Sequence, residues 1–97
     1  MKKFVLLHVG FESPTEEVMS EWNKWFEMIA EFQNEGDNIG FGTGKEVTSE
    51  TVNDLAWDVN ALTGISIIEV ESMEKAIELA KECPAITSVR VYELRQG

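Results

Sequence analysis

The residues of this chain most able to do chemistry are its only histidine, His8, and three polar residues in strand-like segments, Ser66, Arg90 and Tyr92. An imidazole titrates near neutrality, so His8 is a candidate general base or proton shuttle. Arg90 can bind a substrate carboxylate with its planar guanidinium group, and Ser66 and Tyr92 can orient a ligand. Each also has a structural explanation: a packed histidine with satisfied nitrogens, an ion pair, and hydroxyls bonded to the main chain. No motif specifies a reaction, so catalysis stays an open alternative.

Trp57 is a further candidate, because it lies in the polar segment WDVN. An exposed ring there can serve as a lid or a partner contact, although a loop tryptophan can also fold onto the core. Trp22 and Trp25 instead fall on a stripe of helical period and are predicted to be core residues. Cys83 lies on a buried stripe before a proline, which favours an inert thiol.

Several classes of ligand have little support in the sequence. The formal net charge of −10, from 18 acidic and 8 basic residues, repels phosphate backbones and anionic membranes, so we expect no nucleic-acid or membrane partner. One histidine and one cysteine at distant positions do not indicate a metal site. The glycines of the segment GFGTG lack the flanking pattern of a phosphate loop and are predicted to make turns. We therefore expect no metal and no cofactor.

The cellular location is predicted from the N-terminal segment, the length of the apolar stretches and the cysteine count. The N-terminal segment MKKFVLLHVGFE turns acidic at Glu12 without a small-residue cleavage site, so it is predicted to be a first strand and not a signal peptide. No apolar stretch approaches the roughly 20 residues that span a bilayer. A single cysteine fits a reducing compartment, and the cytoplasm is the expected location.

The elements that must position these residues follow from periodicity and end signals. The chain, residues 1–97, is predicted to form a single domain. Strand patterns cover residues 4–9, 63–70 and 87–94, and residues 45–52 have the pattern of an edge strand or ribbon followed by a loop over 53–62. One helix is predicted from an N-cap at Ser13 to Gly36, and a second from an N-cap at Ser72 to Pro84.

The resulting order is β-α-β-β-α-β. It predicts an α+β, ferredoxin-like fold, with a four-stranded antiparallel sheet and two helices on one face. The aliphatic pairs Ile65/Ile67 and Val89/Val91 are expected to face the helices. On the opposite face we expect His8, Ser66, Arg90 and Tyr92 together with Phe4, Leu6, Ile68 and Leu94, as the lining of a shared barrel or a ligand pocket.

Oligomeric state is predicted from the first strand. Residues 4–9, FVLLHV, are apolar on both alternating faces. Since two helices can cover only one face of a small sheet, we expect a homodimer formed through the other sheet face.

The segments SPTEEVMSEWNKWFEMIAE, GKEV, ALTGISIIEVESMEKAIELAKECP and VRVYEL are similar in content and order to the YCII-related (DGPF-type) family along nearly the whole chain. This resemblance implies a dimeric α+β barrel, in which two four-stranded sheets pack face to face. An enzymatic role has been suggested for some members from a His/Asp pair. Here His8 lies in the first strand and no DGPF segment follows the second, so that chemistry is not carried over.

Two function classes remain after the sequence is considered. One is a dimer that binds or transforms a small molecule in a barrel cleft lined by the candidate residues, with Trp57 near its mouth. The alternative is a non-catalytic structural or regulatory dimerisation module.

Overall fold

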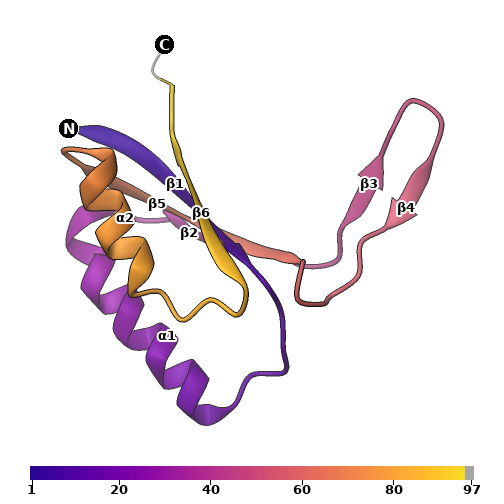
Figure 1. Cartoon of the computed structure of the whole chain (residues 1–97), viewed down its shortest axis with the longest axis horizontal. Helices are drawn as coiled ribbons and strands as arrows, with labels where there is room; N and C mark the ends of the chain where they lie inside the picture. The colour runs from indigo at the N-terminus through magenta and orange to yellow at the C-terminus, as the bar shows by residue number, and fades with distance from the viewer. Residues whose placement is uncertain (96–97) are drawn as a thin grey trace.

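The architecture is a four-stranded antiparallel sheet with two helices, and a separate two-stranded hairpin (Figure 1). The computed structural model describes residues 1–95. Its elements in chain order are β1 (Lys2–Val9), α1 (Glu16–Ile29), a short 3-10 turn η1 (Ala30–Phe32), β2 (Asn38–Gly40), β3 (Lys45–Val47), β4 (Val52–Asp54), β5 (Leu62–Val70), α2 (Met73–Lys81) and β6 (Ser88–Glu93).

The main sheet has the strand order β2-β5-β1-β6, and all its neighbours are antiparallel. The two long strands β1 and β5 form its centre, and β2 and β6 are its edges. This order is compatible with a ferredoxin-like fold. The prediction of an α+β protein with two helices and a four-stranded antiparallel sheet is therefore confirmed.

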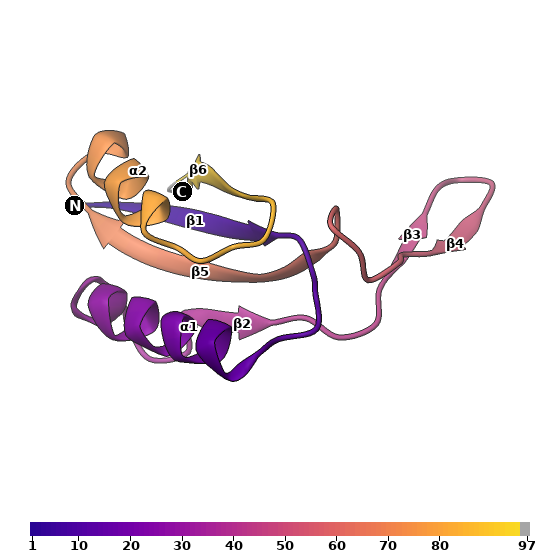
Figure 2. The ribbon, with the colours of Figure 1, turned by 60° about the horizontal axis from the view of Figure 1, so that its bottom comes forward.

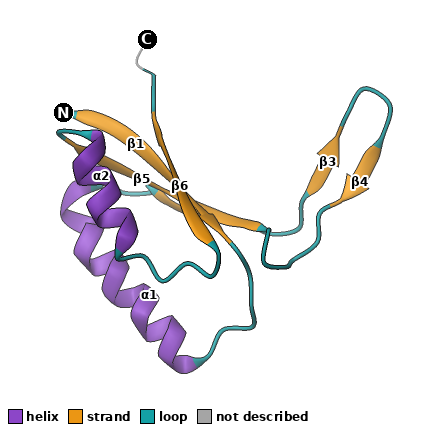
Figure 3. Ribbon diagram, viewed as in Figure 1, coloured by secondary structure: helices purple, strands orange, loops and turns teal. Residues whose placement is uncertain are grey.

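The sequence predicts an edge strand or a ribbon over residues 45–52, and the structure shows the ribbon. Residues 45–52 are not part of the main sheet, because β3 and β4 pair with each other as a separate ribbon (Figure 3). The main sheet uses β2 instead, in which Gly40 pairs with Gly64 of β5. A Cβ atom at Gly64 would lie 2.6 Å from the carbonyl oxygen of Ile39. The absence of a side chain at Gly64 thus permits this close pairing.

The helix ends are fixed by side-chain caps. The hydroxyl of Thr15, not that of Ser13, accepts the N–H of Val18 at 3.2 Å, so α1 begins two residues later than predicted. Ser72 caps α2 as predicted, by accepting the N–H of Lys75 at 3.2 Å. No helix within residues 1–95 combines the length and apolar character needed to cross a membrane.

The core lies between both helices and one face of the sheet. From the sheet it contains Phe4, Leu6, Ile68 and Val70, and from the helices Trp25, Ile29, Ala76 and Leu79. The indole N–H of Trp25, a residue that is only 3% exposed, donates to the carbonyl of Leu79 at 2.9 Å and so joins α1 to α2. The assignment of Trp25 to the core is confirmed.

Within residues 1–95, no helix lies on the other face of the sheet. Its rows follow from the strand pairing, in which Leu7 lies between Ile65 and Arg90, and Val5 lies between Ile67 and Tyr92. We call these six residues, with Ile39 next to Ile65, the open face.

Candidate functional site

His8 lies under the helices in a closed polar cluster. Its side chain is 5% exposed, and its Nε2 atom lies 2.8 Å from the hydroxyl oxygen of Ser66. Its Nδ1 atom lies 3.6 Å from the sulfur of Cys83. The edges of Trp22 and Trp25 pack against the imidazole at centroid distances of 5.1 and 5.3 Å. Both ring nitrogens therefore have partners within the fold.

Burial keeps the members of this cluster neutral. It lowers the pKa of His8 to about 4, because the charged imidazolium loses its hydration. Burial also raises the pKa of the Cys83 thiol to about 12, a change that a hydrogen bond from the backbone of Ala85 only partly opposes. The contact of a thiol, an imidazole and a hydroxyl resembles a nucleophile, its base and an orienting group. At neutral pH, however, it holds no thiolate and no imidazolium, so it serves as a hydrogen-bond chain between β1, β5 and the end of α2.

Arg90 and Tyr92 lie on the opposite side of the sheet from His8. In the antiparallel register His8 is paired with Val89, whereas Arg90 is paired with Leu7. Paired residues share a face, so Val89 and Val91 accompany His8 under the helices. The expectation that His8, Ser66, Arg90 and Tyr92 line the same face of the sheet is therefore wrong. The structure brings His8 and Ser66 into contact and places Arg90 and Tyr92 on the open face.

The misassignment has a physical cause. The alternation along β5 gives it one purely aliphatic face, Ile65 and Ile67, and such a face is expected to pack on the helices. In the structure Ile65 and Ile67 lie on the open face. The buried face of β5 contains Ser66, whose hydroxyl is satisfied by His8. A buried polar residue with a hydrogen-bond partner costs little, and hydrophobicity alone does not identify the core face.

A hollow of about 300 Å³ opens beside His8, between α1 and the β2 edge of the sheet. Its lining combines aromatic rings with strand backbone: His8, Trp22, Phe26, Asn38, Ile39, Gly40, Thr63, Gly64 and Ile65. Neither Arg90 nor Tyr92 reaches it. A small group entering this hollow would meet the imidazole with both nitrogens already engaged.

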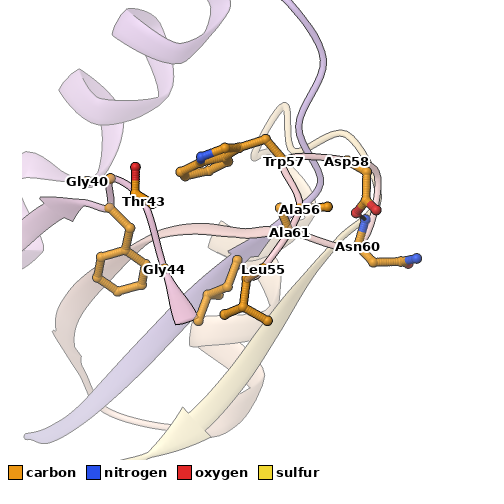
Figure 4. Close-up of a pocket in the computed structure, with 12 residues that line it drawn as sticks. Gly40, Thr43, Gly44, Leu55, Ala56, Trp57, Asp58, Asn60 and Ala61 are labelled. Carbon is orange, nitrogen blue, oxygen red and sulfur yellow. Dashed lines mark hydrogen bonds between the residues drawn. The ribbon is translucent and has the colours of Figure 1, made fainter. Parts of the chain in front are cut away.

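A larger cavity, with a volume of about 680 Å³, lies where the hairpin leaves the sheet. Two segments form its walls, the glycine-rich loop of residues 40–44 and the loop of residues 55–62 (Figure 4). Trp57 is 41% exposed and lies in this cavity, so the alternative of a core position does not hold. In Figure 4 its ring points toward Thr43, whereas Asp58 and Asn60 point away to the other side. We call this space the Trp57 cavity.

The loop that carries Trp57 is held in place by its backbone. The carbonyl of Asp58 accepts the N–H groups of Phe11 at 2.8 Å and of Ala61 at 3.0 Å. The N–H of Gly10 donates to the carbonyl of Ala61 at 2.7 Å, and the rings of Phe11 and Trp57 stack edge-on at 5.5 Å. These contacts tie the loop to the end of β1, so the cavity is formed without a ligand.

The two hollows are neighbours, since Gly40 lines both of them. Sequence reasoning identified Trp57 in the larger one but missed Phe41, Leu55 and Leu62, which also line it. The available signal was the run of three glycines around Phe41, which was interpreted only as a turn. Within residues 1–95, no group of three or more His, Cys, Asp or Glu side chains could hold a metal ion.

No family model matches the chain, and no curated protein matches it. The class that the structure defines is a small α+β protein with a ferredoxin-like strand order, an uncovered sheet face and a preformed apolar cavity. Its similarity to the YCII-related family stays a prediction.

Proposed function

We propose that this protein is a homodimer that binds a small apolar molecule in the Trp57 cavity and does not transform it. The observation that carries the binding proposal is the cavity itself. Its volume of about 680 Å³ lies in the range of roughly 300–1,000 Å³ typical of ligand sites. Its walls combine Trp57, Phe41 and Leu55 with a few polar groups, which is the usual composition of such sites.

The lining restricts the chemistry of the ligand. A tryptophan ring beside a phenylalanine and a leucine favours a flat, apolar molecule that can stack on the indole. Among the described residues that line the cavity, none has a basic side chain, and the one acidic residue, Asp58, points its carboxylate away to the other side in Figure 4. The net charge of −10 further disfavours anions. The expected ligand is therefore an aromatic or alicyclic molecule that is uncharged or cationic.

Binding without catalysis is favoured by the state of His8. A general base must come within hydrogen-bond reach of the proton that it removes. The two nitrogens of His8 contact Ser66 and Cys83, and the imidazole does not line the Trp57 cavity. Its enclosure also favours the second candidate function, a structural or regulatory module without a ligand.

The homodimer is supported by the open face. Its centre is formed by Val5, Leu7, Ile65 and Ile67, a contiguous apolar surface of the kind that marks protein interfaces. Lys3 and Glu69 are paired across the strands on the same face, and a face that carries both signs of charge can complement a copy of itself across a twofold axis. The resemblance to the YCII-related family, which implies face-to-face sheets, supports the same arrangement. The predicted cytoplasmic location is part of this proposal.

The ligand is tested by thermal-shift screening with uncharged and cationic aromatic compounds. We expect at least one compound to raise the melting temperature of the wild type and of Trp57→Phe, but not that of Trp57→Ala. Val59→Ala is a matched control, because Val59 is an exposed apolar residue of the same loop outside the cavity lining. If no compound acts, or if those that act do so equally on Trp57→Ala, the structural module is the better function.

The dimer is tested separately by sedimentation at micromolar concentration. The wild type should sediment at twice the monomer mass, and Leu7→Asp should be monomeric because it buries a charge in the interface. Met19→Asp, at an exposed apolar position on α1, is the control and should stay dimeric. A folded wild-type monomer would exclude the dimer.

A further inference from the structure

The hairpin of residues 44–55, here called the arm, projects away from the rest of the molecule. In Figures 1 and 2 it points beyond the end of β5 and lies over no part of the main sheet. Its strands β3 and β4 pair only with each other. At the tip, the N–H of Thr48 donates to the carbonyl of Thr51 at 2.9 Å, and their hydroxyls lie 2.8 Å apart. The arm is thus a regular hairpin with no protein surface beneath it.

Such an arm lacks the burial that a hairpin needs. The cross-strand pair Val47 and Val52 is 70% and 62% exposed. An isolated two-stranded hairpin is marginally stable in water, and packing against another surface normally supplies the rest. At its base the arm is held by the hydrogen bond from Leu55 N–H to the Gly44 carbonyl, at 3.0 Å. The exposed valine pair therefore marks a surface that is suited to a partner.

The charges on the arm complement a group on the open face. Glu46 and Glu50 lie on the arm, and among the described residues neither belongs to an ion pair. Arg90 lies on the open face beside Leu7 and is equally without an ion pair within residues 1–95. Arg90 is exposed among apolar neighbours, so its guanidinium group is available to a carboxylate from outside the chain.

We propose that in the homodimer the arm of each copy packs along the β6 edge of the other copy's open face, beside the sheet-to-sheet contact, with Glu46 or Glu50 paired to Arg90 of β6. The occupant is a second copy because the arm and the open face belong to the same chain, are complementary in charge and apolar character, and point apart within it. This inference rests on the proposed dimer. It also bears on the ligand site, since Gly44 and Leu55 at the base of the arm line the Trp57 cavity. A second copy that holds the arm would fix one wall of that cavity.

The test uses charge reversal in trans. One variant is Arg90→Glu, and the other combines Glu46→Lys with Glu50→Lys. Each homodimer then opposes like charges, and we expect its dissociation constant to rise at least about tenfold. An equimolar mixture restores both contacts, because the acidic arm of the first variant meets Arg90 of the second, and the basic arm of the second meets Glu at position 90 of the first. The heterodimer should form with a dissociation constant within about threefold of the wild-type value.

The matched controls reverse charges at exposed positions of α1 and η1: Lys24→Glu for the first variant, and Glu27→Lys with Glu31→Lys for the second. Each control changes the net charge by the same amount as the variant to which it is matched, and it should dimerise like the wild type. All the substituted residues are exposed, so folding is not at risk. Sedimentation gives the dissociation constants, and native mass spectrometry identifies the heterodimer.

The inference is overturned if Arg90→Glu and the double variant Glu46→Lys with Glu50→Lys each dimerise as well as the wild type. It is also overturned if dimerisation is weakened in both variants and their mixture stays monomeric. In either case the proposed dimer still stands, provided that the wild type is dimeric and Leu7→Asp is not. A monomeric wild type would overturn the dimer and the arm contact together.

Discussion

Protonation of His8 should destabilise the fold as the pH falls through the weakly acidic range. His8 is the only histidine, it is buried, and both its nitrogens are engaged. In the unfolded chain its pKa returns to the ordinary value of 6.5, whereas burial lowers the pKa in the folded protein to about 4. Because the folded value is the lower one, the unfolded chain takes up the proton first. Stability is therefore complete above pH 6.5 and falls as the pH decreases toward about 4.

The magnitude follows from the two pKa values. Their difference corresponds to about 3 kcal/mol once the pH is below both, and to about 2 kcal/mol between pH 7 and pH 5. His8 is the only histidine of the chain, so a loss of this size between pH 7 and pH 5 is assigned to its side chain.

Urea unfolding followed by tryptophan fluorescence, at a fixed protein concentration, gives the free energy of unfolding at each pH. In His8→Gln, an amide can still bond to Ser66 but takes no proton, and the loss between pH 7 and 5 should disappear. Cys83→Ala, which keeps the imidazole, should retain most of it. Equal pH slopes in the wild type and His8→Gln would refute the burial argument.

Two further pairs of substitutions test the packing. Trp25→Ala should cost about 3–5 kcal/mol in urea unfolding, whereas Trp57→Phe should leave stability nearly unchanged, because the first ring is core and the second is partly exposed. Gly10→Ala should cost about 1–3 kcal/mol or more, since φ is 110° and a Cβ atom would lie 2.6 Å from the Thr87 hydroxyl. Gly36→Ala has φ of 84° but open space around it, and should cost only about 1 kcal/mol. Equal losses within either pair would contradict these assignments.

The parts of the fold that were predictable are those with long patterns and clear end signals. β5 spans nine residues and α2 has a serine cap, and both were located to within about two residues. β2 was missed because three residues, Asn38–Gly40, are too few to show alternation. Residues 45–52 do contain strand pattern, but a pattern does not name the partner strand, so their pairing as a separate hairpin could not be derived.

The candidate site shows the same limit at the level of single side chains. Ser66 was interpreted as a ligand-facing residue because it interrupts an aliphatic strand, yet it is buried as the partner of His8. The compensating residue lies 58 positions away in the sequence, and nothing local indicates it. Trp57 was more informative, because a large ring among polar neighbours has no local element to bury it. An exposed position for Trp57 was therefore one of the alternatives that its sequence neighbours indicated.

The exposed apolar residues, more than the buried polar ones, support the proposed binding surfaces. The polar groups of His8, Ser66 and Cys83 satisfy one another, and within residues 1–95 no buried side-chain nitrogen or oxygen lacks a hydrogen-bond partner. The apolar groups are not satisfied in this way, since Ile39 on the open face, the valine pair of the arm and the ring of Trp57 are exposed, and the centre of the open face is only half-buried. Folding has left apolar surface uncovered in these three places, and association with a second copy and a ligand would cover it.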